Sequence, residues 1–232
     1  MNVMIQIENL TKLYSHHPVL QDLSLHLESD RIIGLLGPNG SGKTTLLKIL
    51  NGLIRHYQGF VGINGKAPGI ESRQMIAYLP DEPYFEDWMK VSDAIRLFSD
   101  FYPDFDTAKC LGMMQRFQLT KDMKIKTMSK GMKEKFQLCL VMSRHARIYI
   151  LDEPIAGVDP ASRDAIIDTI LGNYEPGALM LIATHLVSDL ETIFDEVLMM
   201  SNGQIILHEN AEKLRAEKGM SIDHYFREVF KC

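Results

Sequence analysis

Cysteine is scarce in this sequence, and its few copies lie far apart. Cys110, Cys139 and Cys232 form no CxxC pair. An odd, scattered set is typical of free thiols in a reducing compartment rather than of a disulfide framework or a zinc site. We therefore expect three free thiols.

Long apolar runs and a secretory leader are also lacking. The N-terminal stretch MNVMIQIENLTKLY has acidic and polar residues where a signal peptide has a basic start and an apolar run. The longest apolar stretch, Ala178 to Ala183, is far shorter than the ~20 residues of a membrane-spanning helix. We expect a cytoplasmic protein whose membrane role, if it has one, comes through a partner.

Positive charge is not in excess either. The formal net charge is −5 and the pI is about 5.9, so the chain as a whole is not attracted to nucleic acid or to anionic membranes. Its 232 residues, 46% of them apolar, are enough to build one sizeable core. We expect a single domain over residues 1–232.

What the sequence does contain is an alternation of strand and helix patterns. Apolar and polar residues alternate in two segments near the N-terminus, which predicts half-exposed strands, and later short apolar runs predict buried strands. This order predicts an α/β fold with a mostly parallel sheet covered on both faces, together with an N-terminal antiparallel part. The predicted strands are residues 3–10, 19–27, 31–37, 59–63, 75–80, 147–152 and 178–184, with a hairpin of 195–200 and 204–208; the predicted helices start near 43, cover 160–174 and 185–194, and return in the tail from 211.

The pattern changes between Glu82 and about Arg144. Strand patterns are absent there, and residues 92–102, 109–117 and 130–145 have helical periodicity. We therefore expect an all-helical subdomain, residues 82–144, inserted within the domain.

A glycine-rich loop separates a predicted strand from a predicted helix. Gly37 to Thr44 reads GPNGSGKT and matches G-x-x-x-x-G-K-[ST] in the strand–loop–helix context of a P-loop, which a chance glycine-rich turn would lack. Glycines let successive N–H groups point at one anion, and the helix start adds its positive end. Lys43 is expected to reach the β- and γ-phosphates of a nucleoside triphosphate, and the Thr44 hydroxyl to hold Mg²⁺. The candidate phosphate-binding residues are Gly37, Asn39, Gly40, Ser41, Gly42, Lys43, Thr44 and Thr45.

A second motif ends a buried strand with two acids. In RIYILDEP, Asp152 is suited to the Mg²⁺ shell and Glu153 to orienting or deprotonating the attacking water. A solvated strand end with two acids is the alternative. The P-loop upstream favours the catalytic interpretation.

Together these residues resemble the ATP-binding subunits of ABC transporters, and the resemblance spans nearly the whole chain. GPNGSGKTT is similar to the Walker A loop of that family, and ILDEP is similar to its Walker B strand. The family has a P-loop NTPase (RecA-like) core. Its D-loop corresponds to Ala156 to Asp159, and its switch histidine, which contacts the γ-phosphate, corresponds to His185. Tyr14 lies where the family stacks an aromatic ring on adenine. The alternatives are a plain strand-edge aromatic for Tyr14 and a helix cap for His185.

Two segments depart from the family pattern. MSKGM, residues 128–132, aligns with the LSGGQ signature that closes over the ATP of the opposite subunit; it keeps Ser129 and Gly131, whereas Lys130 replaces a glycine. An ordinary helix start is the alternative. Asp81 replaces the Q-loop glutamine, and we hypothesise that it reaches the metal shell rather than lying in a solvated loop.

The resemblance implies an ATPase that uses ATP and Mg²⁺ and works as a pair with an identical or paralogous ATP-binding subunit. It also implies a membrane-spanning permease partner, contacted near Tyr84, Phe85 and Trp88, that would hold the protein at the inner face of the cell membrane and determine the substrate. At least one of these aromatics could instead pack in the helical insert. No nucleic acid partner is expected. The alternatives are a soluble ABC-type clamp on nucleic acid or ribosomes and a P-loop kinase for a small molecule.

Overall fold

The computed structural model describes residues 2–231, and its centre is a six-stranded sheet in the order β5-β6-β7-β3-β8-β9. Neighbours from β5 to β8 run parallel, and only β9 is antiparallel to its neighbour β8. This confirms the predicted α/β class with a mostly parallel sheet. The strands are β3 (Arg31–Leu36), β5 (Ile76–Leu79), β6 (Ile148–Asp152), β7 (Leu179–Thr184), β8 (Glu196–Ser201) and β9 (Gln204–Asn210).

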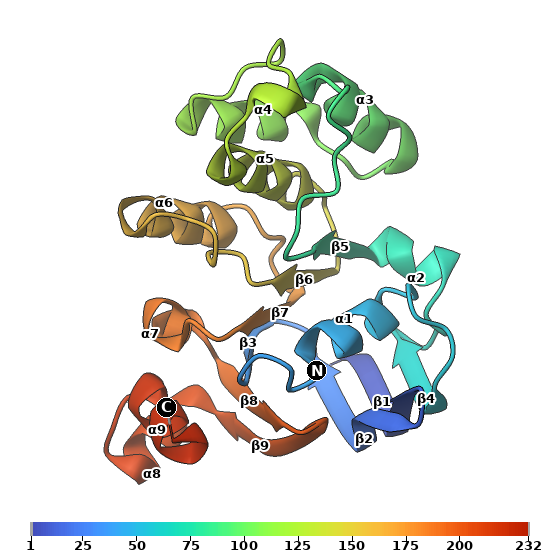
Figure 1. Ribbon diagram of the computed structural model, residues 1–232, viewed down its shortest axis with the longest axis vertical. Helices are drawn as coiled ribbons and strands as arrows, with labels where there is room; N and C mark the ends of the chain where they lie inside the picture. The colour runs from blue at the N-terminus through green and yellow to red at the C-terminus, as the bar shows by residue number, and fades with distance from the viewer. Residues whose placement is uncertain (1, 232) are drawn as a thin grey trace.

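A second, antiparallel sheet has the order β2-β1-β4, formed by β2 (His17–Glu28), β1 (Val3–Tyr14) and β4 (Gln58–Ile63). Both N-terminal strands run further than predicted, because polar ends continue the pairing as far as Tyr14 with His17. The helix α1 (Lys43–Leu50) lies between the two sheets (Figure 1). Its buried Leu46, Leu47 and Ile49 belong to one apolar cluster with residues of both sheets. The P-loop that precedes α1 is therefore fixed by a packed core.

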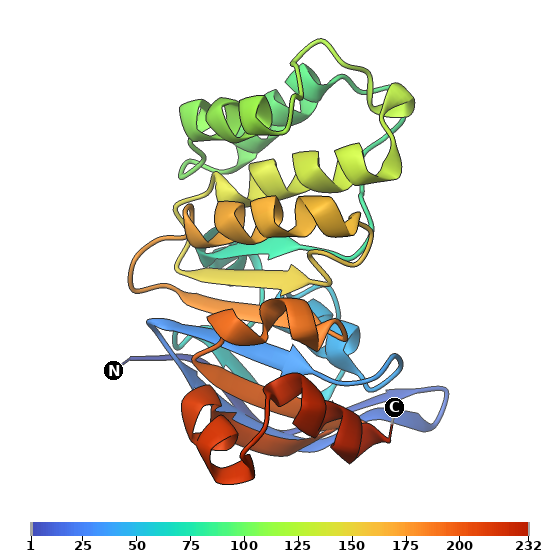
Figure 2. The same cartoon turned by 90° about the vertical axis from the view of Figure 1, so that its left-hand side faces the viewer.

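Helices also cover the face of the large sheet that lies away from α1. Between β5 and β6 the chain forms α3 (Val91–Phe101), α4 (Thr107–Arg116), a 3₁₀ turn (Ile125–Thr127) and α5 (Lys130–Met142). Figure 2 shows α5 and α6 (Pro160–Leu171) side by side over the β5–β6 end of the sheet. Smaller helices follow along the chain: α7 (Val187–Leu190), a 3₁₀ turn (Glu191–Ile193), α8 (Ala211–Lys218) and α9 (Ile222–Phe230).

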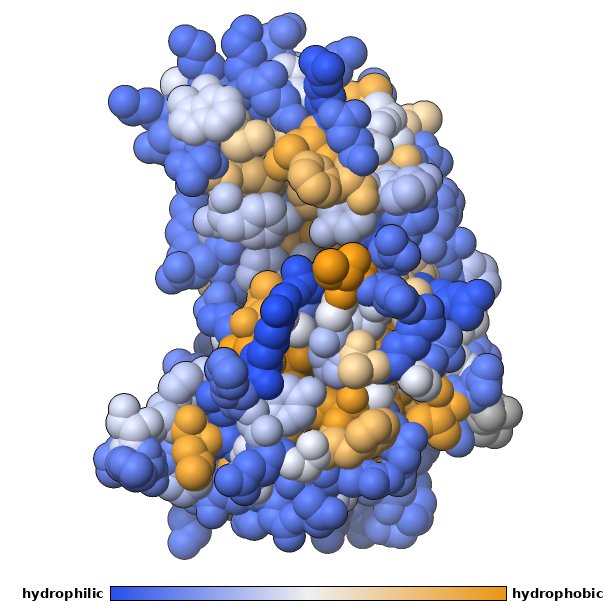
Figure 3. Space-filling model, turned by 90° about the vertical axis from the view of Figure 1, so that its right-hand side faces the viewer, coloured by the Kyte–Doolittle hydropathy of each residue, from blue (hydrophilic) through white to orange (hydrophobic). Residues whose placement is uncertain are grey.

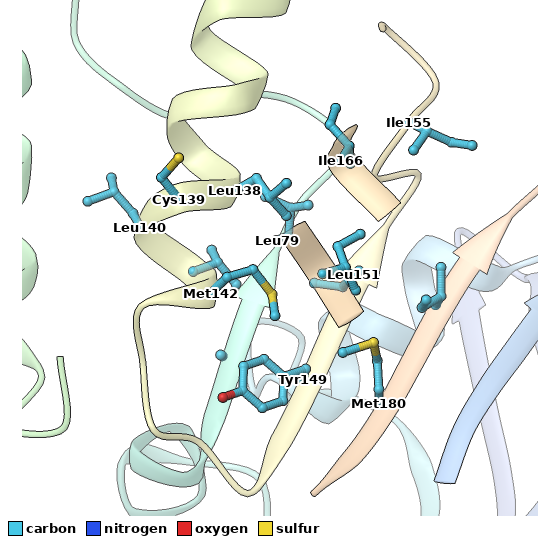
Figure 4. Close-up of a cluster of buried hydrophobic side chains, with 14 of the residues drawn as sticks. Leu79, Leu138, Cys139, Leu140, Met142, Tyr149, Leu151, Ile155, Ile166 and Met180 are labelled. Atoms are coloured by element: carbon cyan, nitrogen blue, oxygen red, sulfur yellow. The ribbon is translucent and has the colours of Figure 1, made fainter. Parts of the chain in front are cut away.

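The helical segment shares its core with the sheet. Figure 4 shows Leu138 and Met142 of α5 facing Leu79 of β5 and Leu151 of β6, all within one buried cluster. Residues 82–144 contain no named strand, as the sequence pattern predicts. The division into a domain and an inserted subdomain at these boundaries stays a prediction.

Two local predictions were incomplete. The helix α2 (Ile70–Met75) was not predicted, because only Ser72 of its residues is buried and no apolar period marks it. The helix predicted over 185–194 is divided into α7 and a 3₁₀ turn, and it begins late because the Leu186 N–H donates to Thr184 Oγ1 at 2.9 Å.

Cys110 and Cys139 are buried free cysteines, whereas Cys232 lies outside the described residues. Within residues 2–231, no helix has both the length and the apolar character needed to cross a membrane.

Candidate nucleotide site

The predicted site residues gather where the parallel strands end. Neighbouring parallel strands present their carboxyl ends at one edge of a sheet, where α/β proteins bind ligands. The P-loop follows β3, and Asp152 ends β6 beside Ala183 of β7. His185 follows β7, whose last residue, Thr184, pairs with Leu36 of β3. Asp81 comes two residues after β5.

The P-loop borders a hollow of about 200 Å³. Gly40 and Gly42 have φ angles of 80° and 109°, a left-handed backbone that side chains rarely adopt. These conformations let the loop turn back on itself and direct N–H groups inward. The lining residues are Val19, Asn39, Gly40, Ser41, Gly42, Lys43, Thr44, Thr45, Asp81 and Glu153.

Lys43 points back into its own loop. Its Nζ donates hydrogen bonds to the carbonyl oxygens of Gly37 at 2.6 Å and Pro38 at 3.3 Å, and it lies 3.9 Å from Glu153 Oε1. Burial lowers the pKa of the amine, and the charges of Glu153 and Asp152 oppose that shift. A triphosphate offers this ammonium stronger acceptors than two carbonyls do.

Asp152 is 1% exposed, and neither of its carboxylate oxygens has a hydrogen-bond partner among the described residues. Burial raises the pKa of this carboxyl to about 6, and the neighbouring Thr44 hydroxyl opposes the shift. Two unsatisfied oxygens beside a hydroxyl fit a hydrated Mg²⁺, which takes one or two protein ligands and completes its shell with phosphates and water. Within residues 2–231, no group of three or more aspartate, glutamate, histidine or cysteine residues could hold a metal ion.

Glu153 is held at both carboxylate oxygens. Oε1 lies 2.9 Å from His185 Nδ1, and Oε2 accepts hydrogen bonds from Thr184 Oγ1 at 3.1 Å and from the His185 N–H at 3.3 Å. The backbone of Glu153 has a φ of 52°, a strained value for a non-glycine residue. Sequence reasoning missed Thr184, although its place between a buried strand and His185 was a usable signal.

Seven predicted site residues are not part of the lining of the phosphate hollow. Gly37, Asp152 and His185 adjoin residues that line it, whereas Tyr14, Ser129, Gly131 and Asp159 lie elsewhere. Tyr14 ends β1 and is 46% exposed, with Lys12 Nζ 4.6 Å from the centroid of its ring. Ser129 caps α5 by accepting the Met132 N–H, and Asp159 caps α6 by accepting the Ser162 N–H. Gly131 lies in the first turn of α5. Any role of Tyr14, Ser129, Gly131 or Asp159 in nucleotide binding therefore needs either the part of a nucleotide that extends beyond its phosphates or a nucleotide on a second subunit.

A separate apolar hollow of about 290 Å³ opens between α3 and the start of β5. Figure 3 shows apolar side chains gathering on this face beneath the helices. Tyr84 is part of its lining, whereas Phe85 packs on Phe136 within the core at 5.2 Å between ring centroids, and Trp88, 76% exposed, is not part of it. The other lining residues are Asn51, Leu53, Arg73, Ile76, Tyr78, Leu97, Phe98, Phe101, Tyr102, Val141 and Arg144.

The fold and site define a P-loop nucleotide-binding domain, and comparison with known proteins gives the family. A sequence model of the ABC transporter family matches residues 20–156. The chain is 30% identical to the uncharacterized ABC transporter ATP-binding protein YxlF of Bacillus subtilis, over 94% of this chain and 75% of that one. It is 33% identical to the uncharacterized ABC transporter ATP-binding protein MJ1023 of Methanocaldococcus jannaschii, over 92% and 80%. A solved ATP-binding subunit of an ABC transporter superimposes with a TM-score of 0.87 at 26% identity, covering 98% of this chain and 99% of the other.

The chain therefore belongs to the ABC transporter ATP-binding family. It is an ATP-binding, ATP-hydrolysing subunit of an ABC transporter, as the sequence resemblance implied. Membership favours transport over the soluble clamp that was considered as an alternative. The individual site residues and their roles remain predictions.

Proposed function

We propose that this subunit closes with a second ATP-binding subunit around two MgATP and uses their hydrolysis to drive a membrane permease. The observation that carries the proposal is the position of Glu153. Its carboxylate is fixed by Thr184 and His185 at the edge of the phosphate hollow, 3.9 Å from the P-loop lysine. A carboxylate held beside the phosphates supports hydrolysis as well as binding.

In this proposal the loop amides of residues 39–45 surround the phosphates, and Lys43 exchanges its two carbonyl acceptors for phosphate oxygens. Thr44 and Asp152 would hold Mg²⁺, and Asp81, which borders the same hollow, joins its shell. A Mg²⁺ ion held there would supply positive charge that offsets the charge of the phosphates. Tyr14 would stack on the adenine, for which its exposed ring is available.

Glu153 orients the attacking water and accepts its proton, and His185 positions the γ-phosphate. General-base groups of this kind contribute about 10²- to 10⁴-fold to a rate. The hydrogen bonds from Thr184 and the His185 N–H limit the freedom of the Glu153 carboxylate, which would keep it in one orientation for the reaction.

The second subunit completes the site. Ser129 and Gly131 at the start of α5 would contact the γ-phosphate of the ATP held by the partner, and Asp159 would lie at the same interface. A helix start with free N–H groups and a hydroxyl suits such an anion. That these residues are absent from the lining of the chain's own phosphate hollow is what a site shared between subunits requires.

The apolar hollow beneath α3 is the proposed seat of the permease, which would place this subunit at the cytoplasmic face of the cell membrane. Its rim carries Leu53, Leu97 and Phe101, which are 55%, 45% and 73% exposed. Exposed apolar side chains grouped around a cavity are typical of protein interaction sites. The sequence expectation put this contact near Tyr84, Phe85 and Trp88. The proposal puts it at the hollow that Tyr84 and Phe101 line.

The test is partner capture together with turnover. We expect the native chain to hydrolyse ATP without an added acceptor and to co-purify with a multi-span membrane protein. Phe101→Glu would abolish co-purification and leave ATP binding intact, whereas Phe60→Glu, at an exposed site on β4, would change neither. A chain that co-purified with nucleic acid instead, or that turned over ATP only with a small-molecule acceptor, would contradict the proposal.

A further inference from the structure

One carboxylate of α5 is buried without being fully satisfied. The Glu134 side chain is 15% exposed, and its Oε2 is buried with no hydrogen-bond partner among the described residues. Oε1 lies 3.8 Å from Lys130 Nζ, one helical turn earlier. Burial raises the pKa of this carboxyl, and Lys130 opposes the shift. The nucleotide mechanism described above makes no use of Glu134.

The Glu134 carboxylate rests directly on the backbone of Gly157. A Cβ placed on Gly157 would collide with both Glu134 oxygens, so the contact exists because residue 157 has no side chain. Gly157 lies in the turn that follows the catalytic candidate Glu153, where the Ala156 N–H donates to the Glu153 carbonyl at 3.2 Å. Glu134 also borders a small cavity together with Asp81, Asp152 and Glu153. Helix α5 thus touches the segment that holds Glu153.

The cation of this pair is free to leave. Lys130 is 76% exposed, and an exposed pair between positions i and i+4 of a helix contributes little to stability. Lys130 also lies between Ser129 and Gly131, the two residues that face the second subunit's nucleotide in the proposed function. Its ammonium therefore has two alternative anions, the Glu134 carboxylate in its own chain and a phosphate in the other subunit.

We propose that Glu134 is a positioning residue that links the nucleotide on the second subunit to this chain's own Glu153. The inference rests on the proposed function, because it needs the paired arrangement. When Lys130 turns to the partner's triphosphate, the buried Glu134 carboxylate loses its cation beside three other acids, an unfavourable state. It relaxes by moving off Gly157, and the turn that starts at Glu153 moves with it. The nucleotide bound to the second subunit thereby changes the position of Glu153 in this chain.

The test is a double-mutant cycle in the subunit pair. Glu134→Gln keeps the shape and removes the charge, and Lys130→Met keeps most of the stem and removes the cation. Steady-state ATPase rates over a range of ATP concentrations give kcat, KM and the Hill coefficient. We expect each variant to lower kcat by about tenfold, the effect of a typical coupling free energy between contacting residues. We also expect the Hill coefficient to fall toward one, the KM of Glu134→Gln to stay within about twofold and the double variant to have a kcat no lower than that of either single one.

Matched controls come from α3. Arg96 and Asp100 form the same i,i+4 geometry at 3.8 Å, with both side chains exposed, so Arg96→Met and Asp100→Asn are expected to change neither kcat nor the Hill coefficient. Gly157→Ala tests the contact itself. It should lower the melting temperature when Glu134 is present and not in a Glu134→Ala background, where the space is open.

If the kcat of the double variant fell by the product of the two single effects, the inference would be overturned. An unchanged Hill coefficient in Glu134→Gln would overturn it as well. Both results leave the proposed function standing if the native chain pairs in ATP and hydrolyses it. A native chain that neither pairs nor hydrolyses ATP contradicts the proposed function, and the inference falls with it.

Discussion

The carboxylate of Glu153 lies 2.9 Å from Nδ1 of His185, so the residue expected to activate water and the residue expected to contact the γ-phosphate are in contact. They come from the ends of two neighbouring parallel strands, β6 and β7. Because both backbones belong to one buried sheet, their separation is set by the fold. We therefore propose that Glu153 and His185 are preorganised for hydrolysis.

Thr184→Val tests this preorganisation. The substitution keeps the shape of the side chain and removes the hydroxyl that donates to Glu153 Oε2 at 3.1 Å. We expect kcat to fall by about tenfold, the effect of one lost hydrogen bond to a charged group, with the ATP dissociation constant unchanged. Thr169→Val is the control, because that buried hydroxyl donates to the Ala165 carbonyl within α6. Equal rates for native chain and Thr184→Val would show that the hydroxyl does not position Glu153.

The raised pKa of Asp152 predicts how stability depends on pH. The folded pKa is about 6, whereas the unfolded value is near 3.9, so the folded chain binds more protons between these values. The free energy of unfolding of the nucleotide-free chain therefore falls as pH rises from about 4 to about 6. Above pH 6 the ionised Asp152 carboxylate lowers this free energy by its full amount.

Asp152→Asn should remove this cost. We expect it to raise the free energy of unfolding by on the order of 2–3 kcal/mol at pH 7.5 and by little at pH 4, measured by urea denaturation without nucleotide. Asp100→Asn, at an exposed carboxylate, is the control. A gain that did not depend on pH would show that Asp152 is not held at an unfavourable charge.

Asp81→Gln restores the residue that the family usually has at this position. If Asp81 joins the metal shell, the variant should need more Mg²⁺ for half-maximal turnover, because an amide oxygen is a weaker ligand than a carboxylate. A magnesium titration of the ATPase rate measures this. Unchanged magnesium dependence and unchanged turnover would leave Asp81 as an ordinary loop residue.

Arg144 predicts a stability effect at the junction between helices and sheet. It is 2% exposed, donates to both oxygens of Asp104 at 3.0 and 2.9 Å, and donates to the carbonyls of Gln74 and Ile76 at 2.6 Å each. Asp104→Asn leaves the guanidinium without its counter-charge, so we expect a loss of about 3 kcal/mol in the free energy of unfolding. Asp100→Asn should change it by less than about 0.5 kcal/mol. A small loss for Asp104→Asn would mean that the backbone carbonyls alone satisfy Arg144.

The sequence was most informative where one residue type has one physical use. A P-loop needs glycine, lysine and a hydroxyl in fixed order, and a buried strand that ends in Asp152 and Glu153 marks the carboxyl edge of a sheet. These local rules predicted the α/β class and brought the correct elements together at the phosphate hollow.

Relationships between distant segments could not be predicted in the same way. Nothing in the order of residues indicated that Arg144 reaches the carbonyls of Gln74 and Ile76, or that Glu134 lies on Gly157. Such contacts depend on how α5 packs on the sheet, and one helix pattern fits several packings. The helix α2 was missed for a simpler reason, because its exposed residues carry no periodic signal.

The most direct test of the account is the solution mass of the Glu153→Gln variant with and without MgATP, measured by light scattering after size exclusion. We expect a monomer without nucleotide and a dimer with MgATP, because ATP that is bound but not hydrolysed would keep the MSKGM segment of each chain closed over the other's site. A monomer under both conditions, with ATP shown to be bound, would contradict closure between identical chains.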